Sequence, residues 1–298
     1  MIKDEIYSSI FLNATVFLNS SIKSVNSGLN YYKNKVLSIV NLQMALELAI
    51  KAKIVSDYGV VNILQNVNSD ITDNELEEMY YSNKLIVREF DNLKNFLKSK
   101  NRFNFDKPEY LYIERFQKWR NKLVHFNYSF SDEENSQIEK DIIHVLVYIL
   151  GVLMSDDVND DDRTYMQDHI DMDEYGKLMK NAIYFDTLSD MIDSEYGDPY
   201  YCPICDRKLL TPNKKCLGCL LSFKDSPCYG FVKCTYCHED MVIYDKANIK
   251  YNKNMIRGLC LYCKNYTTVY ECPKCGIAVN MESFDKTDCS PEYCKWRE

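Results

Sequence analysis

Three polar side chains that could act on a phosphate group lie within the stretch 119–126. Arg120 and Asn121 are neighbours, and His125 follows Asn121 by four residues. On a helix, Asn121 and His125 share a face, and the long side chain of Arg120 can reach the same place. A permanently charged guanidinium suits a phosphate, and an imidazole transfers protons near neutral pH. These groups suffice for RNA cleavage by attack of the 2′-hydroxyl on its own phosphate, with no metal needed for catalysis.

The run Arg120-Asn121-Lys122-Leu123-Val124-His125 resembles the Arg-x(4–6)-His motif of HEPN domains, in which an Asn often follows the Arg. The upstream stretch 45–52 resembles a second recurrent HEPN helix, in which a Glu, here Glu47, faces the motif. The resemblance covers roughly residues 1–155. It implies an all-α bundle that forms a homodimer with the motif helices facing each other. It also implies a metal-independent endoribonuclease of toxin–antitoxin or antiviral-defence type that leaves 2′,3′-cyclic phosphate ends.

Under this resemblance, Arg120 binds and polarises the scissile phosphate and His125 transfers protons. Asn121 orients a phosphate or sugar oxygen, and Glu47 holds the Arg or the His in place. Glu47 lies in a stretch that is otherwise almost wholly apolar, where an ionised carboxylate needs a partner. The alternative partner is Lys51, which is four residues further on and therefore on the same helix face.

Thirteen cysteines, all of them after residue 201, dominate the rest of the sequence. Twelve of them form five Cys-x-x-Cys pairs and one looser pair: Cys202/Cys205, Cys216/Cys219, Cys234/Cys237, Cys260/Cys263, Cys272/Cys275 and Cys289/Cys294. Two such pairs present four thiolates tetrahedrally and close a structural zinc site that has no open position. The sequence therefore predicts about three structural zinc ions per chain.

The cysteine pairs can share metals in two ways. Sequential pairing joins 202/205 to 216/219, 234/237 to 260/263, and 272/275 to 289/294, whereas an interleaved alternative joins 260/263 to 272/275. We favour sequential pairing because the alternative leaves the other pairs to meet at longer range. Cys228 is left over in either case. His238 follows Cys237 and could replace a distal cysteine, although a place outside the ligand set is favoured.

Basic residues recur between the third and fourth Cys-x-x-Cys pairs, namely Lys246, Lys250, Lys253 and Arg257. On a helix they would form one basic stripe beside Tyr251, and tyrosines can stack on RNA bases. Three asparagines in the segment argue against a continuous helix, and a solvated hairpin tip is the alternative. We expect the zinc-binding half to select the RNA or to sense a trigger.

Hydrophobic periodicity divides the chain into an all-α helical bundle, which the resemblance implies is HEPN-like, and a small β-rich zinc-ribbon domain. The bundle is assigned to residues 1–195 and the zinc-ribbon domain to residues 200–298. Helices are predicted at roughly 4–25, 31–57, 73–80, 83–100, 107–127, 133–154 and 172–192, and strand-like pieces at 230–233, 241–244 and 266–270. The acidic run 155–162 predicts a solvated break, and His144, within an apolar run, predicts a core histidine.

Charge is divided unevenly between the two halves. Residues 200–298 contain 15 Lys and Arg against 11 Asp and Glu, which leaves 21 against 33 for residues 1–199. An acidic bundle disfavours a general grip on nucleic acid. We therefore expect a selective nuclease whose RNA is held locally or delivered by a partner, such as an antitoxin or a trigger protein.

The sequence also gives an expectation for where in the cell the protein is located. No secretory signal or membrane-length apolar run is visible, and dense cysteine pairs indicate metal binding in a reducing cytoplasm.

The competing hypothesis is a non-catalytic adaptor, in which the HEPN bundle only dimerises and the zinc ribbons dock a protein or nucleic acid.

Overall fold

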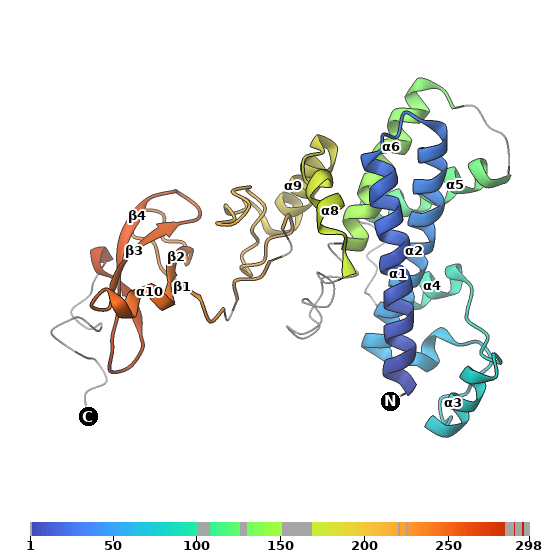
Figure 1. The fold of residues 1–298 in the computed structure, drawn as a ribbon, viewed down its shortest axis with the longest axis horizontal. Helices are drawn as coiled ribbons and strands as arrows, with labels where there is room; N and C mark the ends of the chain where they lie inside the picture. The colour runs from blue at the N-terminus through green and yellow to red at the C-terminus, as the bar shows by residue number, and fades with distance from the viewer. Residues whose placement is uncertain are drawn as a thin grey trace. The chain divides into compact units, whose positions relative to one another are not determined.

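The computed structural model describes residues 2–100, 108–125, 130–150, 169–219, 221–224, 226–283, 289 and 294 (Figure 1). The chain divides into two compact units, Met1–Thr187 and Leu188–Glu298, and each is described by itself. The first unit is helical, and the second contains an antiparallel sheet. None of the described helices combines the length and apolar character that crossing a bilayer requires.

Two long helices, α1 (Ile2–Asn26) and α2 (Tyr32–Tyr58), run side by side and form the centre of the first unit (Figure 1). The chain reverses between them at Gly28, whose φ of 94° lies in the left-handed region that favours glycine. Near this reversal the hydroxyls of Ser21 and Ser38 are 3.1 Å apart and buried. Their small side chains let the two helices approach closely.

Several shorter elements follow this pair along the chain. They are η1 (Val60–Ile63), α3 (Asp73–Tyr81), α4 (Phe90–Ser99), α5 (Pro108–His125), α6 (Asp132–Tyr148), α8 (Met172–Leu178) and α9 (Ala182–Tyr196). Helix α2 contacts α1, α4, α5 and α6, as expected for a central helix. Its Leu37, Val40 and Met44 nevertheless remain exposed. The boundary between the units falls within α9.

Capping boxes explain where α3 and α6 begin. The side chain of Thr72 accepts a hydrogen bond from the backbone N–H of Glu75, and the Glu75 carboxylate accepts one from the N–H of Thr72. Ser131 and Glu134 make the same reciprocal pair at the start of α6. Each box satisfies backbone donors that have no partner inside the helix, and so fixes its first residue.

Two of the predicted helices are wrong in extent. The helix expected from residue 83 begins only at Phe90, because Asn83 has a φ of 55° and Val87 pairs with Leu64 in a short β-bridge. The helix expected at 172–192 is two helices, and Asn181 caps the second by accepting a hydrogen bond from the N–H of Tyr184. The predicted acidic break at 155–162 lies outside the described residues.

The second unit contains a five-stranded antiparallel sheet in the sequential order β1-β2-β3-β4-β5. The strands are β1 (Tyr229–Val232), β2 (Val242–Asp245), β3 (Met255–Cys260), β4 (Tyr266–Glu271) and β5 (Ala278–Asn280) (Figure 1). The three predicted strand pieces correspond to β1, β2 and β4. Strand β3 was not predicted, because Arg257 and Gly258 interrupt its apolar pattern.

One face of this sheet packs on a short helix, α10 (Lys246–Tyr251). Ile249 of α10 is fully buried in a cluster with Val242 and Val269. Gly258 lies in the same layer, where an added Cβ would be 2.7 Å from Val242. A larger residue at position 258 would therefore push β2 and β3 apart.

Candidate functional site

Helix α5 carries two of the three predicted catalytic side chains on its partly exposed side. Nη1 of Arg120 donates a hydrogen bond to Oδ1 of Asn121 at 2.9 Å. Phe116 and Leu123 are buried on the opposite side of α5. His125 is the last residue of α5, and its side chain lies outside the described residues. The expected helical position of the motif is confirmed.

A buried carboxylate fixes α5 against α6. Asp141 of α6 is fully buried and accepts hydrogen bonds from Nε and Nη2 of Arg115 at 2.6 and 2.5 Å. It also accepts from Nε1 of Trp119 and Nε2 of Gln137, both at 2.9 Å. Hydrogen bonding to Asp141 raises the pKa of the Arg115 guanidinium. Because these donors converge on one carboxylate of α6, they fix how α5 is rotated about its own axis.

A second link between these helices lies nearer to Arg120. Nζ of Lys122 is 3.3 Å from the carboxylate of Glu134, and it lies 4.8 Å from the ring centroid of Trp119. Trp119 in turn packs edge-on against Phe130. The segment of α5 that carries Arg120 is thus held on both sides of the motif's first residue.

Glu47 pairs with Lys51, four residues further along α2. Oε1 of Glu47 lies 2.7 Å from Nζ of Lys51, and the Glu47 side chain is 27% exposed. This is the alternative partner that the sequence left open. Among the described side chains, the structure brings Glu47 to Lys51 and Arg120 to Asn121, and it does not join the two pairs.

The expectation that His144 is a core histidine is wrong. The side chain is partly exposed, and Nδ1 lies 2.7 Å from the carbonyl oxygen of Lys140. The imidazole stacks on Tyr112 with 3.9 Å between ring centroids, and Arg115 lies over the same tyrosine ring. His144 therefore lies at the rim where α6 meets α5.

Sequence reasoning missed the network around Asp141. The signal was present, because Asp141 directly precedes the apolar run that begins at Ile142, where an isolated carboxylate needs donors. Arg115 and Trp119 are four residues apart and could have been recognised as one helix face.

Twelve cysteines form three groups of four in the second unit, and the sequential pairing is confirmed. The groups are Cys202, Cys205, Cys216 and Cys219; Cys234, Cys237, Cys260 and Cys263; and Cys272, Cys275, Cys289 and Cys294. In each group the four sulfur atoms lie within 4.8 Å of one another. Neighbouring Sγ atoms are 3.4–4.0 Å apart. Four thiolates about 2.3 Å from a tetrahedral metal would be about 3.8 Å apart, so each group fits an ion such as zinc.

The Cys-x-x-Cys pairs share one backbone geometry. In all five, the N–H of the first cysteine donates to the carbonyl oxygen five residues later: Cys202 to Arg207, Cys216 to Leu221, Cys234 to Glu239, Cys260 to Asn265 and Cys272 to Ile277. The residue after the second cysteine has a positive φ at Asp206, His238, Lys264 and Gly276. His238 is therefore an exposed turn residue outside the ligand set, and the exposed Cys228 also lies outside all three groups.

The first two cysteine groups are joined by direct contacts within the second unit. The N–H of Tyr201 donates to the carbonyl oxygen of Leu261 at 2.7 Å. The hydroxyl of Tyr200 donates to Glu239 at 2.7 Å, and burial raises the pKa of the Tyr200 phenol. These bonds tie the first group to the end of β3, which carries a ligand of the second.

The predicted basic residues do not form a single helical stripe. Lys246 and Lys250 lie on α10, but Nζ of Lys246 donates to the carbonyl oxygen of Ser226 at 2.8 Å. The helix ends at Tyr251, and Lys253 lies in a turn with a φ of 54°. Arg257 lies on β3. Asparagines at the helix end and in the turn explain this break, because they tolerate such backbone conformations.

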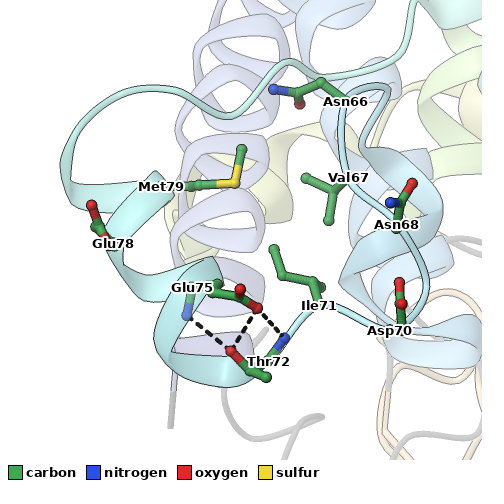
Figure 2. A pocket seen from close by; sticks show the side chains of 9 residues that line it. All are labelled: Asn66, Val67, Asn68, Asp70, Ile71, Thr72, Glu75, Glu78 and Met79. Carbon is green, nitrogen blue, oxygen red and sulfur yellow. Dashed lines mark hydrogen bonds between the residues drawn. The ribbon is translucent and has the colours of Figure 1, made fainter.

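A cavity of about 580 Å³ opens between the loop that follows η1 and helix α3 (Figure 2). Its lining residues are Asn66, Val67, Asn68, Asp70, Ile71, Thr72, Glu75, Glu78 and Met79. In Figure 2 the Glu75 carboxylate is already engaged with Thr72. The lining holds three carboxylates and no basic side chain, so it is unsuited to a phosphate. None of the predicted catalytic residues lines it.

Comparison with known proteins gives no relative for this chain, because no family model, curated protein or solved structure matches it.

Proposed function

We propose that this protein is a metal-independent endoribonuclease of toxin or antiviral-defence type, acting as a homodimer of its helical unit. One observation carries the proposal. Arg120 and Asn121 are hydrogen-bonded at 2.9 Å on a partly exposed helix face, one turn before His125. Helix α5 is held by the buried Asp141, so the pair is presented in a fixed orientation. The resemblance of this run to the HEPN motif points to the same chemistry.

The proposed reaction proceeds without a cofactor. An imidazole of His125 accepts the proton of the RNA 2′-hydroxyl, whose oxygen then bonds to the adjacent phosphorus. The bond from phosphorus to the 5′-oxygen breaks, and a second imidazole, from the other copy, protonates that oxygen. The products are a 2′,3′-cyclic phosphate and a 5′-hydroxyl. Arg120 stabilises the charge that develops on the phosphate oxygens, and Asn121 holds one of these oxygens or the Arg120 guanidinium in place.

The uneven charge of the chain supports a selective enzyme. The bundle carries more acidic than basic residues, so bulk attraction between the catalytic unit and RNA is weak. The second unit is less acidic, with 15 Lys and Arg against 15 Asp and Glu over Leu188–Glu298, and it contains three cysteine groups suited to structural zinc. We assign the selection of the RNA to this unit.

The test is cleavage of total RNA by the purified full-length chain in a brief incubation with EDTA. We expect cleavage that leaves 2′,3′-cyclic phosphate ends. His125→Ala should lower the rate by about 10²–10⁴-fold, which is the usual contribution of a positioned acid–base group. His144→Ala is the matched control, because His144 lies on α6 and takes no part in the proposed reaction.

Two results would decide against the proposal. Cleavage that survives His125→Ala would remove the proposed chemistry. A wild-type chain that cuts no RNA, either alone or with an extract of host cells that supplies triggers, would favour the non-catalytic adaptor.

A further inference from the structure

The outer face of the sheet, opposite α10, carries an exposed arginine stacked on an exposed tyrosine. Alternation along the strands places Met255 and Arg257 of β3 on this face, together with Tyr266 and Thr268 of β4, and all four are exposed. The guanidinium carbon of Arg257 lies 3.9 Å from the ring centroid of Tyr266. The inner face is closed by Ile249 and its neighbours, so only this outer face is open at these positions.

The register of β3 and β4 produces the stacked pair. Arg257 lies opposite Thr268, and Leu259 lies opposite Tyr266. Arg257 and Tyr266 are therefore diagonal neighbours on one face, a distance that a long side chain can bridge to an aromatic ring. Such a pair places two flat surfaces, a ring and a guanidinium, where a third flat group can stack.

Arg257 and Tyr266 both lie at the surface of the sheet. Among the described contacts, the Arg257 guanidinium meets no carboxylate, and the Tyr266 ring is 51% exposed although it is large and apolar. An acid directly opposite on the neighbouring strand would stabilise an arginine on a sheet surface. Here the opposite residue is a threonine, so the positive charge and the ring remain accessible to a ligand.

Two of the cysteine groups lie at the ends of strands β3 and β4. Cys260 at the end of β3 belongs to the second cysteine group, so a metal bound there anchors that strand. At the far end of β4, Tyr270 is buried against Cys272, Cys289 and Cys294 of the third group. A surface that is ordered before binding loses little entropy when a ligand stacks on it.

We propose that this outer face, centred on Arg257 and Tyr266, binds unpaired RNA by base stacking. A flat aromatic ring next to a guanidinium recognises the faces of unstacked bases, which a duplex keeps hidden. Lys253, in the turn that precedes β3, is exposed and can neutralise a phosphate. The inference deepens the proposed function, on which it rests for the identity of the ligand.

The experiment measures binding and leaves cleavage aside. Full-length, metal-loaded protein carrying His125→Ala is titrated into a fluorescein-labelled RNA of about 12 nucleotides, a length within the usual footprint of such surfaces. The RNA is supplied as a single strand or annealed to its complement, and anisotropy is recorded. We expect the single strand to bind about tenfold more tightly than the duplex.

Four substitutions locate the contact. Tyr266→Ala should weaken single-strand binding about tenfold, the usual loss for one stacked base, whereas Tyr266→Phe should retain it. Arg257→Lys keeps the charge but loses the planar group, and should weaken binding several-fold. Tyr251→Ala is the matched control, because Tyr251 is 88% exposed on α10 and lies away from the outer face. If Tyr266→Ala fails to bind metal, Arg257→Lys and the duplex comparison decide the outcome.

The inference is overturned if the duplex binds as tightly as the single strand, or if Tyr251→Ala weakens binding while Arg257→Lys does not. It is also overturned if the chain binds no RNA. The proposed function can fail independently of this inference. If the wild-type chain binds RNA on this face but cleaves none, the nuclease proposal is wrong and the binding surface stands. If the chain cleaves RNA but has no affinity for RNA on this face, the binding surface is wrong and the nuclease proposal stands.

Discussion

Asp141 of α6 and Arg115 of α5 form a bidentate ion pair in which the carboxylate is fully buried and the guanidinium is 37% exposed. The pair lies one to two turns before Arg120 along α5. Any loss of it frees the helix that presents the candidate catalytic residues.

Asp141→Asn should destabilise the helical unit strongly. Removing one partner of a buried ion pair costs about 3–5 kcal/mol, and the partial exposure of Arg115 places the expected loss near the lower end, about 3 kcal/mol. Urea unfolding followed by circular dichroism measures it. Lys3→Ala removes a solvent-exposed pair with Asp73 and should cost less than about 1 kcal/mol. Equal losses for the two variants would contradict a structural role for Asp141.

A double substitution separates the charge from the packing. Replacing Arg115 with Met and Asp141 with Leu exchanges the pair for apolar side chains, which is often neutral or stabilising in proteins. We expect the double variant to be more stable than Asp141→Asn alone. If its free energy of unfolding is lower, the hydrogen bonds from Trp119 and Gln137 contribute more than the ion pair.

Glu47→Gln tests whether Glu47 acts in catalysis. Because its carboxylate is paired with Lys51, the substitution should lower the RNA cleavage rate by less than about threefold and cost about 0.3–0.5 kcal/mol of stability. Arg120→Ala should lower the rate by about 10²-fold or more, as expected for loss of a charge-stabilising donor. The rates are compared in one assay. A fall for Glu47→Gln as large as that for Arg120→Ala would instead place Glu47 in the site.

Metal content should follow the three cysteine groups. We expect about three zinc ions per chain by elemental analysis, and Cys205→Ser should remove about one of them. Cys228→Ser is the matched control and should remove none, because this exposed cysteine belongs to no group. Since structural metal contributes folding free energy, a strong chelator should unfold the second unit and leave the helical signal of the first. A Cys228 variant that loses metal would contradict the ligand assignment.

We expect the buried Lys35 to make the stability of the helical unit depend on pH in the alkaline range. Burial lowers the pKa of its ammonium, although Glu139 opposes the shift, and Nζ donates to Asn135 at 2.5 Å. The unfolded chain therefore holds this proton more tightly than the folded one. The destabilisation caused by burying the charged ammonium is fully present below the folded-state pKa of Lys35. It disappears as the pH rises through the ordinary pKa range of lysine.

Comparison with Lys35→Met isolates that effect. The stability of the wild type relative to this variant should increase between pH 7 and pH 10, as measured by urea unfolding at each pH. Lys53→Met provides the control, because it removes a lysine of the same helix, which pairs with Asp57, and leaves Lys35 in place. A stability difference that stays constant with pH would show that Lys35 keeps its proton equally in both states.

The sequence by itself determined the features that depend on local chemistry. The spacing of the cysteines predicted three four-cysteine groups and their sequential pairing, because two knuckles close together along the chain supply one tetrahedral set. Apolar periodicity located α1, α2 and α3 within about two residues of their observed bounds, since burial of one helix face repeats with the helical turn. It also placed Arg120 and Asn121 on a helix.

Only the tertiary structure decided which distant side chains meet. The donors from α5 to Asp141 and the position of His144 against Tyr112 depend on the rotation of packed helices, which no local pattern specifies. The stacking of Arg257 on Tyr266 depends on the register of β3 against β4, and a shift of one residue would send the two side chains to opposite faces. Residue spacing therefore defined the cysteine groups and the candidate catalytic motif, while long-range packing created the network that holds α5 and the outer face of the sheet.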